Sequence, residues 1–198
     1  FYNPETLGHR PVYEKILGAL FQSVSTRTAG FNSVSISALT SASKFMMVIL
    51  MFIGASPSST GGGIKTTTFS LILLTAYSVI KGDDDLIAFR RRIPRNLAAR
   101  ALAISLISLL VLIGVTMALS IVELDPFLDL LFQTASALGT VGLSSIDTGG
   151  MQDISKILIT LTMFMGRVGP LTLTLAFAKR QSQFGNSIHY PKERIMVG

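Results

Sequence analysis

Residues 136–143 read Ser136-Ala137-Leu138-Gly139-Thr140-Val141-Gly142-Leu143, and an earlier stretch reads Ser25-Thr26-Arg27-Thr28-Ala29-Gly30-Phe31-Asn32. An offset of 112 positions places Thr28 on Thr140 and Gly30 on Gly142. The same offset continues without a gap as far as Gly54 and Gly166, and just upstream residues 20–22 match residues 131–133 at an offset of 111. A turn and a following helix that match in one register predict two copies of one structural unit.

The composition is that of a membrane protein. Of the 198 residues, 49% are hydrophobic and only 14% are charged, with a net charge of +6, and the mean hydropathy is +0.56. Soluble domains carry about 25% charged residues, and disordered or nucleic-acid-binding chains are more polar than this one. The chain has no cysteine, which excludes a disulfide framework, a thiolate metal site and a cysteine nucleophile.

Three apolar stretches are candidates for membrane spans. Residues 101–122 contain no charge, and at about 1.5 Å per residue they would cross a hydrocarbon core of roughly 30 Å. Residues 154–178 are interrupted only by Lys156 and Arg167, and residues 45–80 carry a run of Gly, Ser and Pro at their centre, 54–63. Such a run ends a helix, and non-helical backbone survives in a membrane only inside protein or beside water. We therefore expect an all-α polytopic membrane protein with one broken inner helix.

Two shorter stretches, residues 12–26 and 126–138, are too short to span a membrane, and each is followed by a small-residue turn. A short helix that returns through glycine-containing extended backbone is typical of a re-entrant pore loop. An interfacial helix or a buried loop is the alternative for each stretch taken singly.

The T-x-G pattern in both turns suits a cation filter. A dehydrating K⁺ needs several oxygens at once, which successive backbone carbonyls supply when they face one axis. Glycine at the third position permits the required backbone at little steric cost, and the preceding helix directs its negative, carbonyl end at the ion. The candidate filter residues are Thr28, Ala29, Gly30 and Phe31 with Thr140, Val141, Gly142 and Leu143; the expected K⁺ ligands are the carbonyls of Thr28, Ala29, Gly30, Thr140, Val141 and Gly142.

Loop charges predict the orientation. Segment 81–100 and the tail from residue 179 hold most of the basic residues, whereas Glu123, Asp125, Asp129, Asp147 and Asp153 lie on the other side of the expected spans. The positive-inside rule makes loop 81–100 and the C-terminus cytoplasmic. The acidic residues would form a mouth that concentrates cations.

The two turns, together with Ser59-Thr60-Gly61-Gly62-Gly63-Ile64-Lys65 and Gly166-Arg167, resemble motifs of the Trk/Ktr/HKT superfamily of potassium transporters, in particular its bacterial KtrB-type membrane subunits. The resemblance covers essentially the whole chain. It implies repeated M1–pore-loop–M2 units of the potassium-channel type, four to a pore, of which this chain would supply the third without its outer helix and the complete fourth.

The expected organisation follows from this resemblance. Residues 1–96 would be the third unit, with a pore helix at 12–26, a filter at 28–32, a broken inner helix at 38–80 and a basic cytoplasmic loop at 81–96. Residues 97–180 would be the fourth unit, with an outer helix at 97–122, a pore helix at 126–138, a filter at 140–144 and an inner helix at 154–178. Residues 181–198 would be a cytoplasmic tail.

A gate is expected beneath the filter. Arg167 lies near the middle of the expected span 154–178, where a charge costs roughly 2.5–3.5 kcal/mol, and its counterpart in the other copy is Ala55. We expect it to raise a barrier to K⁺ and to bond carbonyls of the broken segment, whose rearrangement would open the path; a purely structural buried arginine is the alternative. The candidate gate residues are Arg167, Gly54, Ser56, Ser59, Thr60, Gly61, Gly62, Gly63 and Lys65.

The resemblance also implies partners. These are the missing N-terminal half of the same pore, a second subunit in a homodimer, and a cytosolic RCK-type ring that binds nucleotide (ATP or ADP). The chain itself shows no nucleotide site and no bound cofactor is expected; the transported ion is K⁺ and Na⁺ is an open alternative. The expected location is the bacterial cell membrane.

Other functions fit the sequence less well. A secondary transporter, coupled to Na⁺ or H⁺, could place its substrate at the broken helix but would leave the paired T-x-G turns unexplained, as would a purely structural membrane subunit. The run at 61–66 lacks the G-x-x-x-x-G-K-[ST] spacing of a phosphate loop. No nucleophile, acid–base pair or metal cage is evident, so we expect no enzyme.

Overall fold

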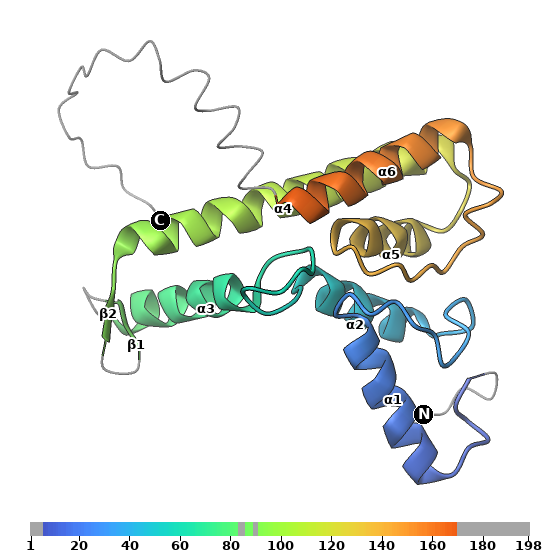
Figure 1. Cartoon of the computed structure of the whole chain (residues 1–198), viewed down its shortest axis with the longest axis horizontal. Coiled ribbons are helices and arrows are strands. Elements are labelled where there is room, and N and C mark those ends of the chain that lie inside the picture. The colour runs from blue at the N-terminus through green and yellow to red at the C-terminus, as the bar shows by residue number, and fades with distance from the viewer. Residues whose placement is uncertain (1–5, 83–85, 89–90, 170–198) are drawn as a thin grey trace.

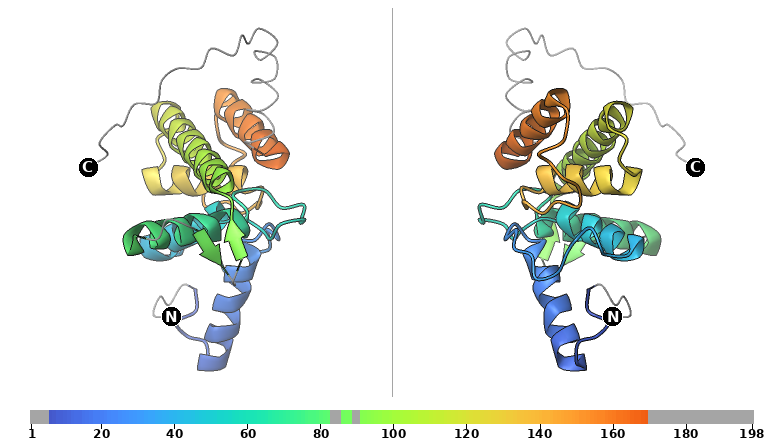
Figure 2. Two further views of the ribbon diagram at one scale, coloured as in Figure 1. Left: turned by 90° about the vertical axis from the view of Figure 1, so that its left-hand side faces the viewer. Right: turned by 90° about the vertical axis from the view of Figure 1, so that its right-hand side faces the viewer.

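The computed structural model describes residues 6–82, 86–88 and 91–169. Along these residues run α1 Val12–Ser25, α2 Ser41–Phe52, α3 Thr66–Lys81, β1 Leu86–Ala88, β2 Arg91–Ile93, α4 Arg95–Val122, α5 Phe127–Leu138 and α6 Asp153–Val168. Helices α2 and α3 follow one another with an irregular loop between them, and α4 runs alongside α6 (Figure 1). Helix α1 projects away from the rest in every view (Figure 2).

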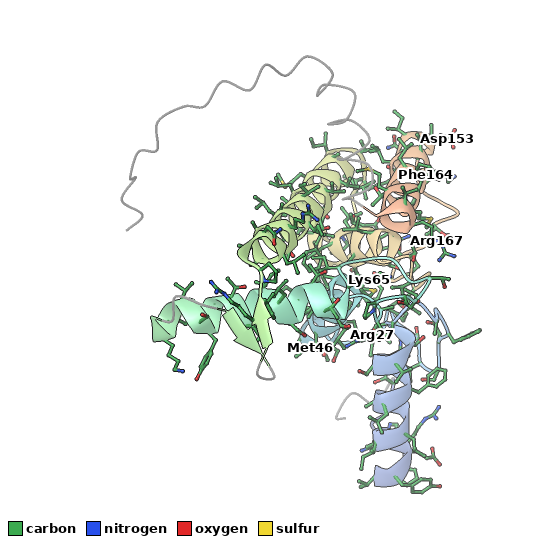
Figure 3. The ribbon with its side chains drawn as sticks, turned by 60° about the vertical axis from the view of Figure 1, so that its left-hand side comes forward. Arg27, Met46, Lys65, Asp153, Phe164 and Arg167 are labelled. Carbon is green, nitrogen blue, oxygen red and sulfur yellow. The ribbon has the colours of Figure 1, made fainter. Side chains whose placement is uncertain are left out.

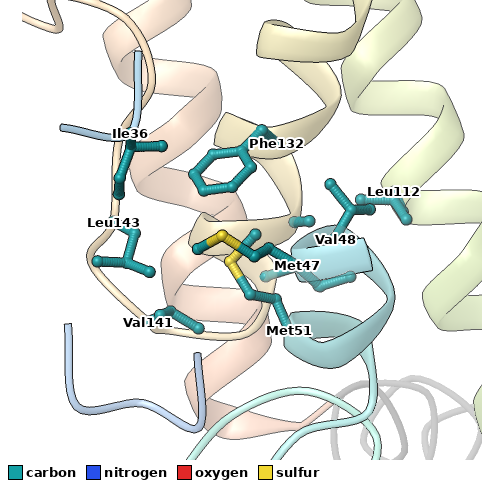
Figure 4. Close-up of a cluster of buried hydrophobic side chains, with 10 residues drawn as sticks. Ile36, Met47, Val48, Met51, Leu112, Phe132, Val141 and Leu143 are labelled. Atoms are coloured by element: carbon teal, nitrogen blue, oxygen red, sulfur yellow. The ribbon is translucent and has the colours of Figure 1, made fainter. Parts of the chain in front are cut away.

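Helix α5 is the centre of the packing. It contacts α2, α4 and α6, and seven consecutive residues from Phe132 to Leu138 are buried. The main hydrophobic cluster surrounds Phe132 with Met47, Val48 and Met51 of α2 and Leu112 of α4 (Figure 4). A helix buried on all sides is a core element, so the turn that follows α5 is carried by the most enclosed part of the fold.

The longest helix, α4, follows directly from its sequence. It is an uncharged run from residue 101 to residue 122, is preceded by Pro94 and ends at Glu123. Proline is tolerated at the start of a helix, because the first N–H groups have no partner within the helix. Within the described residues, Asn96–Val122 is the one helical stretch long and apolar enough to cross a membrane.

Three expectations need correction. The expected basic loop 81–96 contains a two-stranded antiparallel sheet that pairs Leu86 with Ile93 and Ala88 with Arg91, so the fold is predominantly but not wholly α-helical. Helix α4 begins at Arg95, two residues before the expected start of the outer helix at 97. Apolar and β-branched residues at 86, 87 and 93 favour the strands, and Pro94 sets the start of the helix.

The third correction concerns α6. The helix ends at Val168 because Gly169 takes a positive φ of 88°, whereas a continuous helix was expected over 154–178. Residues 170–178 and the expected tail 181–198 lie outside the described residues. Arg167 therefore lies in the last turn of α6.

Candidate ion-conduction site

The two T-x-G turns have the same unusual backbone. Thr28 and Gly30 have φ values of 68° and 73°, and Thr140 and Gly142 have values of 53° and 91°. A β-branched residue at positive φ is a genuine outlier and stores strain of the order of 1–3 kcal/mol. Because both copies place a strained threonine at the same repeat position, both turns require a left-handed residue there. The sequence pattern alone did not reveal this backbone conformation.

Each turn is attached to the C-terminal end of its short helix. After α1, the Ser25 carbonyl oxygen accepts the N–H groups of Ala29 and Gly30, both at 3.2 Å. After α5, the Ser136 carbonyl oxygen accepts the Val141 N–H at 2.9 Å. The negative ends of both helix dipoles therefore lie at the turns.

The two turns lie directly against each other. A Cβ atom on Gly30 would overlap the Val141 carbonyl oxygen, so the close approach of the two backbones requires glycine at this position. The side chains differ between the copies, because Val141 and Leu143 are buried in the main cluster (Figure 4) whereas Phe31 is 68% exposed.

The break in the predicted inner helix is a closed loop, residues 53–65. Its ends meet in a parallel bridge between Ile53 and Ile64, with the Ile64 N–H donating to the Phe52 carbonyl oxygen at 3.2 Å. A Cβ atom on Gly54 would overlap the Gly62 carbonyl oxygen. At the tip, the hydroxyl of Ser59 donates to the Ser56 carbonyl oxygen at 2.6 Å.

The 53–65 loop touches both turns. The Gly62 N–H donates to the Thr140 hydroxyl oxygen at 3.0 Å. A Cβ atom on Gly61 would lie 2.9 Å from the Thr28 Oγ1 atom. The structure thus brings together the predicted filter residues Thr28 and Thr140 and the predicted gate residues Gly61 and Gly62.

Two cations hold carbonyl oxygens of the same loop. Arg167 donates from Nη1 to the Thr60 carbonyl oxygen at 2.6 Å, and Lys65 donates from Nζ to the carbonyl oxygens of Ser59 at 3.0 Å and Gly61 at 2.6 Å. Figure 3 shows both side chains beside the loop. Hydrogen bonds from charged donors are roughly twice as strong as neutral ones. The expected bond between Arg167 and the broken segment is therefore present.

Gly166 positions α6 against the end of α5. A Cβ atom there would overlap the Leu138 carbonyl oxygen and lie 2.8 Å from its carbon. Because this neighbour is backbone, only glycine permits the contact. The contact joins the residue before Arg167 to a carbonyl group two residues before Thr140.

The sequence did not predict the ion pair between Lys44 and Asp129. The Lys44 Nζ and Asp129 Oδ1 atoms are 2.6 Å apart, and the two side chains are only 10% and 15% exposed. The pair joins the first turn of α2 to the first turn of α5. Asp129, expected in an acidic mouth, is therefore neutralised by a partner; the exact repeat of Lys44 at Lys156 was the signal that could have drawn attention to it.

The phosphate-loop alternative does not match the local fold. Helix α2, not a strand, precedes the glycine run, and Lys65 binds carbonyl oxygens of its own loop. Within the described residues no cluster of three or more His, Cys, Asp or Glu side chains could hold a metal ion. The oxygens that the site offers to a cation are backbone carbonyls and threonine hydroxyls.

The fold and the site thus define a predominantly helical protein with two equivalent units, each made of a short helix, a T-x-G turn and a following helix. A profile of the TrkH family, described as cation transport protein, matches residues 4–188. The chain belongs to this TrkH family of cation transport proteins, which confirms the resemblance noted in its motifs.

Several curated relatives are similar along the chain. The Ktr system potassium uptake protein B of Bacillus subtilis (strain 168) is 39% identical over 198 residues, which are 100% of this chain and 44% of the relative. The protein of the same name from Vibrio alginolyticus is 34% identical over 100% of this chain and 43% of its own length. The potassium/sodium uptake protein NtpJ of Enterococcus hirae is 33% identical over 93% of this chain and 42% of its own length. The chain spans less than half the length of these relatives.

A solved structure has the same fold. The crystal structure of the potassium transporter TrkH from Vibrio parahaemolyticus superimposes with a TM-score of 0.75 at 22% sequence identity, over 86% of this chain and 38% of that chain.

Proposed function

We propose that this chain forms part of a K⁺ uptake pathway across the bacterial cell membrane, with the turns at 28–31 and 140–143 as two strands of its filter. The observation that carries the proposal is the contact of two turns with the same left-handed residues, each at the carbonyl end of a short helix. Positive φ at Thr28 and Gly30 on either side of Ala29, and likewise around Val141, would turn successive carbonyls toward one side, as a row of cation ligands requires.

The 53–65 loop is the proposed gate. It contacts both turns through Gly61 and Gly62, so an ion that leaves the filter on that side meets the loop. Arg167 adds a positive charge bonded to Thr60. Displacement of the loop from Thr140 and from Arg167 would open the path.

We infer that segments outside residues 1–198 complete the filter. Leu20-Phe21-Gln22 repeats Leu131-Phe132-Gln133, yet Phe21 is 47% exposed and Phe132 is fully buried. The Gln22 side chain is buried without a hydrogen-bond partner among the described residues, whereas Gln133 accepts the Ser144 hydroxyl at 2.7 Å. Two further units of the same kind, from the rest of a longer protein, would cover α1 and raise the number of turns to four.

The proposed assembly follows the family resemblance. It is a homodimer with one pore in each subunit, docked on a cytosolic RCK-type ring that carries the nucleotide. Loop 81–100 and the C-terminal tail are the proposed cytoplasmic surfaces, because they hold most of the basic residues.

Uptake of K⁺ by a potassium-deficient bacterium that expresses the intact transporter tests the function. Growth at low K⁺ and uptake of Rb⁺ or K⁺ are expected in the wild type, and Arg167→Ala is expected to change both the rate and its control. Absence of K⁺ uptake by the wild type would refute the proposal. Measurement with and without Na⁺ separates a K⁺ pathway from a Na⁺-coupled carrier, which would show a fixed co-ion ratio.

A further inference from the structure

The hydroxyl group of Thr140 connects the proposed filter to the proposed gate. It accepts the Gly62 N–H, with Oγ1 and N 3.0 Å apart. A Cβ atom on Gly62 would lie 2.7 Å from the Thr140 Oγ1 atom and 3.0 Å from the Gly139 carbonyl oxygen. The backbone of the loop at Gly62 therefore packs directly against the Thr140 side chain and the Gly139 carbonyl group.

The other copy of the repeat lacks this bond. Thr28 has the same residue type and the same left-handed backbone as Thr140. A Cβ atom on Gly61 would lie 2.9 Å from its Oγ1 atom, slightly farther than the 2.7 Å between a Cβ atom on Gly62 and Thr140 Oγ1. Its hydroxyl nevertheless has no hydrogen-bond partner within residues 6–82, 86–88 and 91–169. Thr28 is thus a matched internal control for Thr140.

The Thr140 hydroxyl oxygen can bond the Gly62 N–H or bind a K⁺ ion, and each of these interactions weakens the other. While it accepts the Gly62 N–H, it faces the positive end of a peptide dipole, and the Arg167 charge is bonded to Thr60, two residues away. A K⁺ ion at the same oxygen would have to use its second lone pair and would be repelled by both groups. The seated loop and a bound ion therefore compete at this oxygen.

We propose that Thr140 Oγ1 couples ion binding to the position of the 53–65 loop, so that K⁺ bound at this oxygen releases the loop. The proposal rests on the proposed K⁺ pathway. Coupling between two binding events is reciprocal. The loop bonded to Thr140 lowers the affinity of this oxygen for K⁺, and bound K⁺ weakens the contact of the loop with Thr140 by the same factor. One neutral hydrogen bond sets this factor at roughly threefold to tenfold.

Thiol labelling of the loop can measure the coupling. The natural chain has no cysteine, and Ser58 is exposed at the loop tip, so Ser58→Cys introduces a single reporter in this chain. The rate of its modification by a water-soluble thiol reagent is measured in membrane vesicles that contain the intact transporter, as K⁺ replaces N-methylglucamine at constant ionic strength. We expect K⁺ to raise the rate threefold to tenfold.

Variants at the two threonines decide the outcome. Thr140→Val in the Ser58→Cys background is expected to label quickly at all K⁺ concentrations, and Thr140→Ser to restore the K⁺ dependence. Without K⁺, Thr28→Val is expected to label as slowly as the Ser58→Cys background, because the Thr28 hydroxyl does not bond to the loop among the described residues. Thr140→Ala, which also lacks the hydroxyl, serves if the valine variant does not assemble, as judged by gel filtration. Equal labelling rates of Thr140→Val and Thr28→Val without K⁺ would overturn the coupling.

The failures of the two proposals are distinguishable. If K⁺ uptake persists but labelling ignores K⁺ in the Ser58→Cys background, the coupling is wrong and the pathway stands. If the wild type takes up no K⁺, the proposed function itself is wrong.

Discussion

Replacement of Lys44 by methionine should destabilise the protein strongly, because Lys44 pairs with an enclosed carboxylate. Its Nζ atom is 2.6 Å from Asp129 Oδ1, and the side chains are 10% and 15% exposed. The repeat supplies a control at Lys156, which lies 3.7 Å from Asp153 with side chains 45% and 97% exposed. The two lysines share a repeat position and a place in the first turn of a helix but differ in burial.

The expected magnitudes follow from burial. Lys44→Met keeps the length of the side chain but leaves the Asp129 carboxylate without its cation, which costs about 3 kcal/mol when a pair is buried. Lys156→Met removes an exposed pair and should cost at most about 0.5 kcal/mol. The melting temperature shifts by about 2–4 °C per kcal/mol for 150–250 residues and by less for longer chains, so the expected losses in the intact protein are up to about 6–12 °C for Lys44→Met and at most about 2 °C for Lys156→Met.

Thermal unfolding of the purified intact protein in detergent measures both variants. The double variant Lys44→Met/Asp129→Leu should recover most of the loss, because it leaves neither charge without a partner. Equal losses in Lys44→Met and Lys156→Met, or a double variant no more stable than Lys44→Met alone, would refute the reasoning.

Three further substitutions test the contacts around the turns. Gly166→Ala places a methyl group on the Leu138 carbonyl and should lower the free energy of unfolding by roughly 2–3 kcal/mol, whereas Gly114→Ala, with open space around it, should raise it by up to about 1 kcal/mol; chemical denaturation compares them. Arg167→Ala removes the bond to Thr60 and should raise basal Rb⁺ flux severalfold, with Arg167→Lys intermediate because it keeps the charge without the planar donor geometry; unchanged flux in both would count against the gate. Lys65→Met removes two bonds within the 53–65 loop and should speed thiol labelling at Ser58→Cys, with Lys81→Met at the far end of α3 as the control.

Local sequence signals were sufficient for the main features of the fold. The glycine-rich run at 54–63 predicted a break, and the structure has a loop between α2 and α3 there. The repeat predicted two equivalent turns, and both have a threonine and a glycine at positive φ. A helix breaker acts on its sequence neighbours, and a repeat is found by comparing the sequence with itself, so neither requires knowledge of the tertiary structure.

Features that depend on distant contacts could not be predicted in this way. Asp129 was placed with the other acidic residues, because nothing near it in the sequence shows that Lys44, 85 positions away, packs against it. The contacts of Gly30 with Val141 and of Gly166 with Leu138 are likewise tertiary. Strands β1 and β2 were not predicted, because the basic residues of segment 81–100 were interpreted as marking a cytoplasmic loop.

The backbone around Arg167 has a consequence for the rate of opening. Gly166 holds α6 against the Leu138 carbonyl, so the helix cannot move further toward α5, and the charge changes position chiefly by rotation of its own long side chain. Exposed side chains rotate in picoseconds to nanoseconds, whereas loops and lids rearrange in nanoseconds to milliseconds or longer. In the proposed gate the arginine therefore re-equilibrates with every position of the 53–65 loop, and the slower loop sets the time that an ion waits.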